Sequence, residues 1–214
     1  MFKKKNSTIL QSSKVYDSFD FLLIGDTDVG KTCLLNRFCY DFYSSYKKKR
    51  KKPEIHKIST INEGLEYKLQ FWDVLITEDN IDSNRKVIEK SDGIIFVCSY
   101  DNKESLKRIM YWYKLLTPFT DLTSKVITLF VNKNDLDEEI VISENEIKKM
   151  SNELNTCYFS MNAKDGKGVK KAFWDIVLRA IANVYKHENP SKYAEIMWNE
   201  GKIKENKDKD CIIM

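Results

Sequence analysis

Nowhere in this sequence of 214 residues do about 18 apolar residues follow one another, which is the length a membrane-spanning helix needs. The N-terminal residues 1–6 are basic, but no apolar run of signal-peptide length follows them. Residue 2 is phenylalanine, whereas N-myristoylation requires glycine at that position. We therefore expect a chain that neither enters the secretory route nor spans a bilayer.

Cysteine is scarce, and its spacing is irregular. There are five cysteines, an odd number, and no two of them form a C-x-x-C pair. They are Cys33, Cys39, Cys98, Cys157 and Cys211. This pattern argues against both a disulfide framework and a zinc site, and it predicts a reducing, cytosolic compartment.

Neither sign of charge dominates. Lysine and arginine number 36 against 32 acidic residues, which gives a net charge of +4. That excess is too mild to predict nucleic-acid binding without a matching motif, so we expect no nucleic-acid partner. A hydrophobic content of 42% in a chain of this length favours one core and therefore one domain with tails.

Short apolar runs predict strands, and helical periodicities lie between the later ones. The predicted strands are 19–24, 67–72, 93–100, 126–131 and a weaker one at 157–160, with helices around 106–113 and 169–176. Ser143 and Glu146 form an S-x-x-E capping box, and Gly64 lies between two extended runs as a hairpin turn. The alternation predicts an α/β fold with a mostly parallel sheet and one antiparallel edge hairpin. We expect one domain at residues 18–186, an N-terminal extension at 1–17 and a flexible tail at 187–214.

Residues 25–32 read GDTDVGKT, a G-x-x-x-x-G-K-T sequence between a predicted strand and an apolar helix start. Gly25 and Gly30 allow the backbone to wrap until successive N–H groups point at phosphate oxygens, and the helix N-terminus adds partial positive charge. Lys31 would bridge the β- and γ-phosphates, and Thr32 would offer its hydroxyl to magnesium. The predicted phosphate-binding residues are Gly25, Asp28, Val29, Gly30, Lys31, Thr32 and Cys33.

Residues 132–135 read NKND and follow a predicted parallel strand at its carboxyl end, where such sheets bind ligands. The Asp135 carboxylate can accept two hydrogen bonds from the N1–H and N2 amino groups of guanine, a pair that adenine does not present. We expect Asn132 to tie this loop to the phosphate loop and the stem of Lys133 to lie over the purine. After the next strand, a backbone N–H can reach the guanine O6 atom. The residues there are Asn162, Ala163 and Lys164.

The chain from about residue 20 to residue 186 resembles the small GTPases of the Ras superfamily. The resemblance rests on GDTDVGKTCLL, LQFWD, VNKND and NAK, which occur in the order and at the intervals of that family. The chain has no room for the extra helix that Rho proteins carry between their fourth and fifth motifs. Trp72, before Asp73, is typical of Rab or Rho proteins, so the sequence is most similar to a Rab.

The resemblance implies a P-loop NTPase G domain, which is a three-layer α/β sandwich with a mostly parallel six-stranded sheet and helices on both faces. It implies GTP or GDP and Mg²⁺ as cofactors, hydrolysis of GTP to GDP and phosphate, and a monomer. The implied partners are effector, exchange and activating proteins. By the same resemblance, Tyr43 lies edge-on to guanine, and Asp73 holds magnesium through a water.

The sequence departs from the family at its γ-phosphate sensors. Arg50 stands where the family has a threonine, Ile76 replaces a glycine, and Thr77 replaces the glutamine that positions the attacking water. The branched side chain of isoleucine disfavours the close approach that glycine permits. Asp28 also sets a carboxylate beside the phosphates, where repulsion weakens nucleotide retention. With catalysis left to Lys31 and Thr77, we expect slow or absent intrinsic hydrolysis and a blunted switch.

Residues 47–52 form a run of six consecutive basic residues around Arg50. Three interpretations compete. The run can be a solvated loop, it can attract an acidic partner or anionic lipid, or Arg50 can fold over the γ-phosphate and supply charge in cis. Replacing the run by serines would weaken liposome binding under the second interpretation and leave nucleotide affinity unchanged.

Residues 211–214 read CIIM, a C-a-a-X box in which the final methionine favours a farnesyl group on Cys211. A prenyltransferase is therefore an expected partner, and the cytoplasmic face of a membrane, with a cytosolic pool, is the expected location. One lipid chain gives only reversible binding, so a second signal is expected. The candidates are the lysines at 3–5 and the basic run at 47–52.

Two classes of function fit these residues. The first is a working molecular switch that hydrolyses GTP and recruits effectors in vesicle traffic or signalling. The second is a membrane-anchored interaction module that holds GTP persistently or binds nucleotide weakly. A third class, an ATP-using P-loop kinase or transporter subunit, is disfavoured by Asp135 and by the small single domain.

Overall fold

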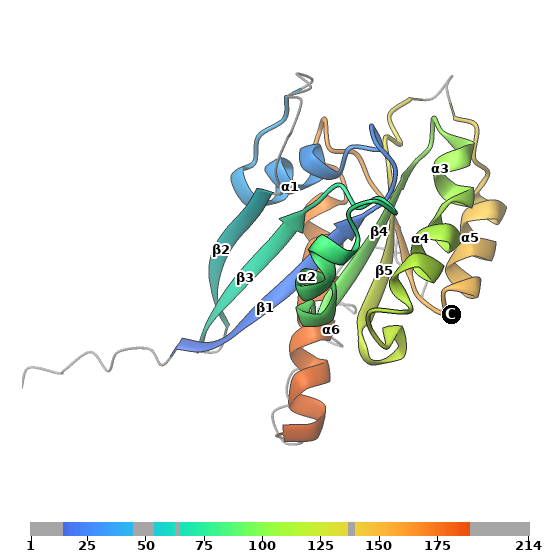
Figure 1. Cartoon of the computed structure of the whole chain (residues 1–214). Coiled ribbons are helices and arrows are strands. Elements are labelled where there is room, and N and C mark those ends of the chain that lie inside the picture. Colours follow the sequence, from blue (N-terminus) through green and yellow to red (C-terminus); the bar gives the residue numbers. More distant parts are fainter. Residues whose placement is uncertain (1–14, 45–53, 63–64, 137–139, 189–214) are drawn as a thin grey trace, which may run out of the picture.

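A computed structural model describes residues 15–44, 54–62, 65–136 and 140–188. Its centre is a six-stranded sheet with the order β2-β3-β1-β4-β5-β6 (Figure 1). The strands are β1 (Val15–Ile24), β2 (Glu54–Asn62), β3 (Leu65–Asp73), β4 (Gly93–Ser99), β5 (Val126–Asn132) and β6 (Tyr158–Ser160). β2 pairs antiparallel with β3, and every other neighbouring pair is parallel. The predicted mostly parallel sheet with one antiparallel edge is confirmed.

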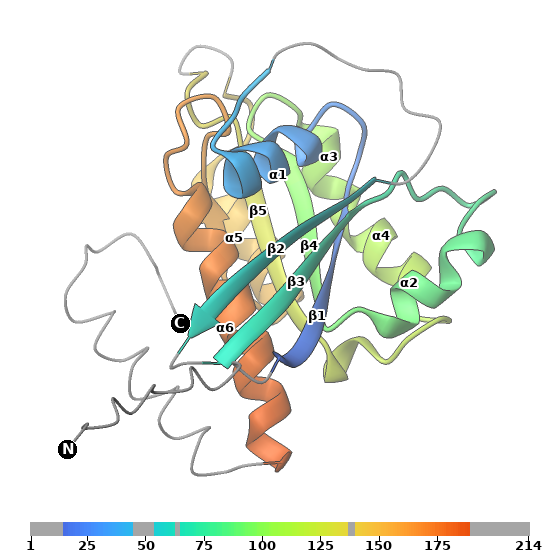
Figure 2. The ribbon, with the colours of Figure 1, turned by 90° about the vertical axis from the view of Figure 1, so that its left-hand side faces the viewer.

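Helices cover both faces of the sheet (Figures 1 and 2). α1 (Lys31–Tyr40) and α6 (Val169–Glu188) pack on one face, while α2 (Arg85–Lys90), α3 (Lys103–Lys107), α4 (Ile109–Leu116) and α5 (Glu144–Glu153) pack on the other. Alternate residues of β1 point to the two layers, because side chains along a strand alternate between its faces. The predicted three-layer α/β sandwich is therefore confirmed. Within the described ranges, no helix has the length and apolar character needed to cross a membrane.

Most predicted elements are present, with shifted ends. β1 begins at Val15, earlier than the predicted strand 19–24, and regular structure extends slightly beyond 18–186 at both ends. The predicted helix around 106–113 is two helices, α3 and α4, separated at Arg108. Ser143 and Glu146 form the predicted capping box of α5. Asn62 pairs with Leu65, so β2 and β3 join through a two-residue connection; the predicted turn residue Gly64 lies outside the described residues.

Phe173 of α6 is the centre of the larger hydrophobic cluster. Its ring stacks on Phe38 of α1 at a centroid distance of 4.4 Å and meets Phe71 of β3 and Phe130 of β5 edge-on at 5.4 and 5.1 Å. Phe173 is fully buried. This one side chain therefore joins both helices of that layer to the sheet.

Replacing Phe173 by alanine should lower the free energy of unfolding by about 3–5 kcal/mol, because the change removes three aromatic contacts and leaves a cavity. Chemical denaturation of the two proteins checks this value. Lys171→Ala, an exposed position on the same helix, is the control and should change stability by less than about 0.5 kcal/mol. Equal losses in the two variants would contradict the central place of Phe173.

Candidate nucleotide-binding site

Residues 25–30 connect β1 to α1 in a loop that requires glycine at two positions. Gly25 has φ +151°, and a Cβ there would lie 2.1 Å from the carbonyl oxygen of Val97. Gly30 has φ +94° and caps the N-terminus of α1. Asp28 also has a positive φ, +63°, which costs a non-glycine residue roughly 1 kcal/mol. The loop therefore has the close approach and the helix N-terminus that a phosphate cradle requires.

Lys31 arches back over this loop. Its Nζ donates to the carbonyl oxygens of Gly25 at 2.8 Å and Asp26 at 2.6 Å. The Lys31 side chain is buried, so its charge stays close to the loop rather than extending into solvent. The loop thus combines a fixed ammonium group with the N-terminus of α1, which is the chemistry that suits a polyphosphate.

Thr32 and Asp73, the two predicted magnesium ligands, lie together. The Thr32 hydroxyl donates to Asp73 Oδ2 at 2.6 Å. Thr32 is in the first turn of α1, and Asp73 ends β3, which pairs with β1 so that Asp73 lies opposite Leu23. A hydroxyl and a carboxylate are the oxygen donors that Mg²⁺ prefers, so the two residues fit this ion.

Asn132 joins three loops. Its amide nitrogen donates to the Val29 carbonyl in the phosphate loop at 2.9 Å, and its Oδ1 accepts from the Ala163 N–H at 3.1 Å. Asn132 is only 2% exposed. The predicted tie between the NKND loop and the phosphate loop is therefore present, and it extends to the loop after β6.

Lys133 and Asp135 of the NKND loop form ion pairs that the sequence did not predict. Lys133 has φ +67°, and its Nζ lies 2.7 Å from Asp101 Oδ2. Burial would raise the pKa of Asp101, but the hydrogen bond from Lys133 holds that pKa below its usual range. Asp135 lies 4.0 Å from Lys164, so two residues assigned to guanine face each other. The Asp101 contact fixes the direction of the Lys133 stem.

The loop after β6 uses its own backbone donors. The Asn162 N–H donates to the Lys167 carbonyl, the Ala163 N–H to Asn132, and the Lys164 N–H to Asn162 Oδ1 at 2.7 Å. The donor that the sequence assigned to guanine O6 is therefore already engaged within the protein. Arg37 of α1 holds the same loop through the carbonyl oxygens of Ala163 at 3.0 Å and Lys164 at 2.6 Å.

Tyr43 lies beyond the end of α1. Its ring is half-buried and packs against the larger hydrophobic cluster. Nearby, the Cys33 thiol donates to the carbonyl oxygen of Ser44 at 3.6 Å, which ties this segment back to the first turn of the helix. The helix is therefore linked to the segment that carries the predicted guanine-facing ring.

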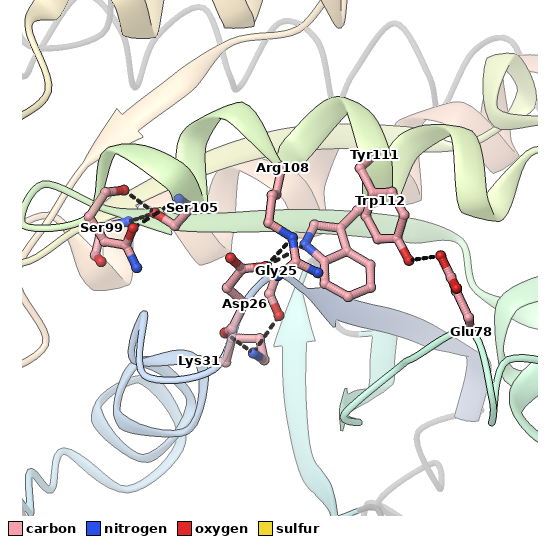
Figure 3. Close-up of polar contacts among 10 residues, drawn as sticks. Gly25, Asp26, Lys31, Glu78, Ser99, Ser105, Arg108, Tyr111 and Trp112 are labelled. Carbon is pink, nitrogen blue, oxygen red and sulfur yellow. Dashed lines mark hydrogen bonds and ion pairs between the residues drawn. The ribbon is translucent and has the colours of Figure 1, made fainter.

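The segment after β3 is packed down rather than open. Ile76, at the position of the family glycine, is 2% exposed and belongs to the second hydrophobic cluster. The Thr77 N–H donates to Asn80 Oδ1 at 2.8 Å. Further along, Glu78 accepts a hydrogen bond from the Tyr111 hydroxyl of α4 at 2.6 Å (Figure 3). Arg50, the basic run at 47–52, the lysines at 3–5 and Cys211 lie outside the described residues.

A phosphate loop and an NKND loop that share one buried asparagine place the domain in a class, the guanine-nucleotide-binding P-loop domains. The comparisons with known proteins make this assignment specific. The model of the Ras family matches residues 20–182. The chain belongs to the Ras family, and within it the chain is a Rab-like small GTPase.

Three relatives illustrate the similarity. Ras-related protein RABD1 of Arabidopsis thaliana is 33% identical over 166 residues, which cover 77% of this chain and 80% of that protein. GTP-binding protein ypt1 of Schizosaccharomyces pombe is 31% identical over 167 residues, covering 72% and 76%. Ras-related protein Rab-30 of Homo sapiens is 27% identical over 192 residues, covering 87% and 93%. The similarity therefore spans most of each chain.

Three residues around the site were missed in the sequence. Arg37 holds the loop after β6, Asp101 holds Lys133, and Asp26 contacts α4. Asp26 is inside the phosphate-loop motif, but at a position where the motif specifies no residue type. Arg37 and Asp101 reach partners far along the chain, and no local pattern in the sequence marks them.

Replacing Gly30 by alanine should raise the dissociation constant for GDP at least tenfold. A tenfold change corresponds to about 1.4 kcal/mol of binding free energy. The new Cβ would lie 2.2 Å from Asn132 Nδ2, so it would break the tie between the two loops. Titration with a fluorescent GDP measures the change. Gly166→Ala is the matched control, because φ there is also positive at +85° but the nearest atom is the flexible Arg37 Cδ at 3.2 Å. A similar loss in both variants would mean that backbone strain alone is responsible.

Proposed function

We propose that this Rab-like switch binds GTP and GDP at the site built on Asn132 but hydrolyses GTP slowly on its own. The observation that carries the proposal is the position of Ile76, which is buried in the hydrophobic cluster where the family has a glycine. In the family, that glycine N–H contacts the γ-phosphate and the following glutamine positions water. Here both functions fall to residues that are fixed to other partners.

The proposed roles follow the chemistry of each side chain. Lys31 supplies positive charge to the β- and γ-phosphates, and Asp135 recognises guanine through its carboxylate. Thr32 and Asp73 would hold Mg²⁺, Asp73 through a water, and the bound ion would neutralise phosphate charge. The contact between Thr32 and Asp73 supports this assignment, because the hydroxyl oxygen and the carboxylate oxygen lie 2.6 Å apart.

Slow hydrolysis follows from the short reach of Thr77. Its N–H is bound to Asn80, and Asn80 also donates to the Leu75 carbonyl at 2.8 Å, so the turn is closed on itself. A threonine hydroxyl in this turn lacks the length with which glutamine orients a water. Ile76, on the other side, would have to leave the core for the segment to move toward a phosphate.

A non-hydrolysing module that stays loaded with GTP is the second candidate, and the same burial of Ile76 favours it. The two candidates differ in the chemical step and not in nucleotide binding. Phosphate release in a single turnover therefore separates them.

The purified protein, loaded with GTP and Mg²⁺, should release phosphate below the order of 10⁻⁴ s⁻¹, which is the intrinsic rate of a small GTPase with its glutamine in place. Thr77→Gln should raise this rate, because glutamine has the length to position water. Thr77→Val, which keeps the shape of threonine and removes the hydroxyl, should leave it unchanged. A wild-type rate on the order of 10⁻⁴ s⁻¹ or above, or a slower Thr77→Val variant, would refute the proposal.

We further propose that the switch works in vesicle traffic or signalling at the cytoplasmic face of a membrane, with effector, exchange and activating proteins as partners. The similarity to proteins named Ras-related and Rab supports this role. Cys211, within CIIM, is the proposed lipid acceptor, and prenyltransferase the enzyme that modifies it.

Incubation with farnesyl diphosphate and farnesyltransferase should add the mass of one farnesyl group to the wild-type protein and none to Cys211→Ser. Cys39→Ser is the control and should still be modified, because burial raises the pKa of Cys39 to about 11 and keeps that thiol unreactive. Intact-protein mass spectrometry reads the result. Addition of the lipid to Cys211→Ser would place the acceptor elsewhere.

A further inference from the structure

The phosphate loop carries a carboxylate that contacts α4. Asp26 Oδ1 accepts a hydrogen bond from the Trp112 indole at 3.0 Å and lies 3.4 Å from Arg108 Nε (Figure 3). Only 11% of the Asp26 side chain is exposed, and Trp112 is buried. We call Asp26, Arg108 and Trp112 the Asp26 clamp. Neither the motif nor the residue roles described above account for these contacts.

The clamp reaches Lys31 through a single residue. The carbonyl oxygen of Asp26 accepts from Lys31 Nζ at 2.6 Å, while the side chain of the same Asp26 is held by α4. A rotation of the Asp26 backbone would therefore disturb both contacts together. Holding the side chain limits the orientations of the carbonyl and, with it, the position of the ammonium group.

Arg108 is itself held by two aromatic rings. Its guanidinium lies over the rings of Trp112 at 5.1 Å and Tyr111 at 5.3 Å. The Tyr111 hydroxyl donates to Glu78, and this bond raises the pKa of Tyr111, so the phenol stays protonated. Arg108 occupies the break between α3 and α4, where its backbone belongs to neither helix. The guanidinium of Arg108 is thus held by stacking on two rings as well as by its ion pair with Asp26.

We propose that Arg108 is a positioning residue for the phosphate-binding lysine, acting through Asp26. Charge gives the pair a second effect. A carboxylate beside a polyphosphate opposes binding unless a cation compensates it, and Arg108 is the nearest cation to Asp26 Oδ1 among the described ion pairs. The inference rests on the proposed contact between Lys31 and the phosphates.

The test compares GDP with GMP on the whole protein. Lys31 acts on the β-phosphate, which GMP lacks. A misplaced lysine should therefore weaken the binding of GDP and leave the binding of GMP unchanged. A general defect in folding would weaken both. Isothermal titration at equilibrium, with GMP at millimolar concentrations, gives both dissociation constants for each variant.

Arg108→Met and Asp26→Ala should each raise the dissociation constant of GDP about 3–10-fold, in the range of a partly buried charged pair, with GMP unchanged within about twofold. The double variant should bind GDP as Asp26→Ala alone does, because Arg108 acts through Asp26 and has no further effect once that carboxylate is removed. Asp26→Asn, which keeps an acceptor for the Trp112 indole, should lose less affinity for GDP than Asp26→Ala. Lys107→Met removes an equal charge from the neighbouring exposed position and should change neither constant.

Additive losses of GDP affinity in the double variant would overturn the proposal. Equal losses of affinity for GDP and GMP would also overturn it, and so would an unchanged dissociation constant for GDP. Lys31→Ala is the reference that tests the underlying assignment. If Lys31→Ala fails to weaken GDP relative to GMP, the proposed role of Lys31 is wrong. If it succeeds while Arg108→Met does nothing, only the positioning role of Arg108 fails.

Discussion

The side chain of Asn132 is the contact on which the arrangement of the site depends. It binds the Val29 carbonyl and the Ala163 N–H, so loops that follow β1, β5 and β6 share one buried group. The parallel sheet brings the carboxyl ends of these strands to one edge, but it does not fix the distances between their loops. Losing either bond would leave a buried polar group unpaired, at about 1–3 kcal/mol. One residue therefore makes the phosphate half and the base half of the site a single unit.

The layers of the fold follow from the sequence because buried parallel strands read as continuous apolar runs. β4 is fully buried and was predicted almost to the residue. The start of β1 was not, because its register with β3 is irregular between Val15 and Ser18. The separation of α3 from α4 at Arg108 also escaped prediction. Apolar side chains keep helical spacing across it, and neither glycine nor proline marks the break.

The candidate site also has a part that the sequence predicted and a part that it did not. Motif residues such as Gly30 and Lys31 were assigned from local spacing, because a phosphate loop is built from consecutive backbone groups. The contacts that hold the site join residues far apart: Arg37 reaches Ala163 across 126 positions, and Asp26 reaches Trp112 across 86. Such pairs depend on how helices dock on the sheet. One sequence alone carries no signal for them.

The proposed roles assign nucleotide binding and nucleotide sensing to different parts of this molecule. The hydrogen bonds of Asn132 and of the Thr32–Asp73 pair join residues outside the segment after β3, whose Ile76 is anchored in the core. Drawing Ile76 out of the core costs roughly 1.5–3 kcal/mol, while one backbone hydrogen bond to a charged phosphate returns about as much. Reversing a two-state equilibrium from 1:99 to 99:1 takes about 5.5 kcal/mol. A γ-phosphate that contacts this segment through one N–H cannot supply that difference. On this ground we propose that the domain retains guanine nucleotide while distinguishing GTP from GDP only weakly.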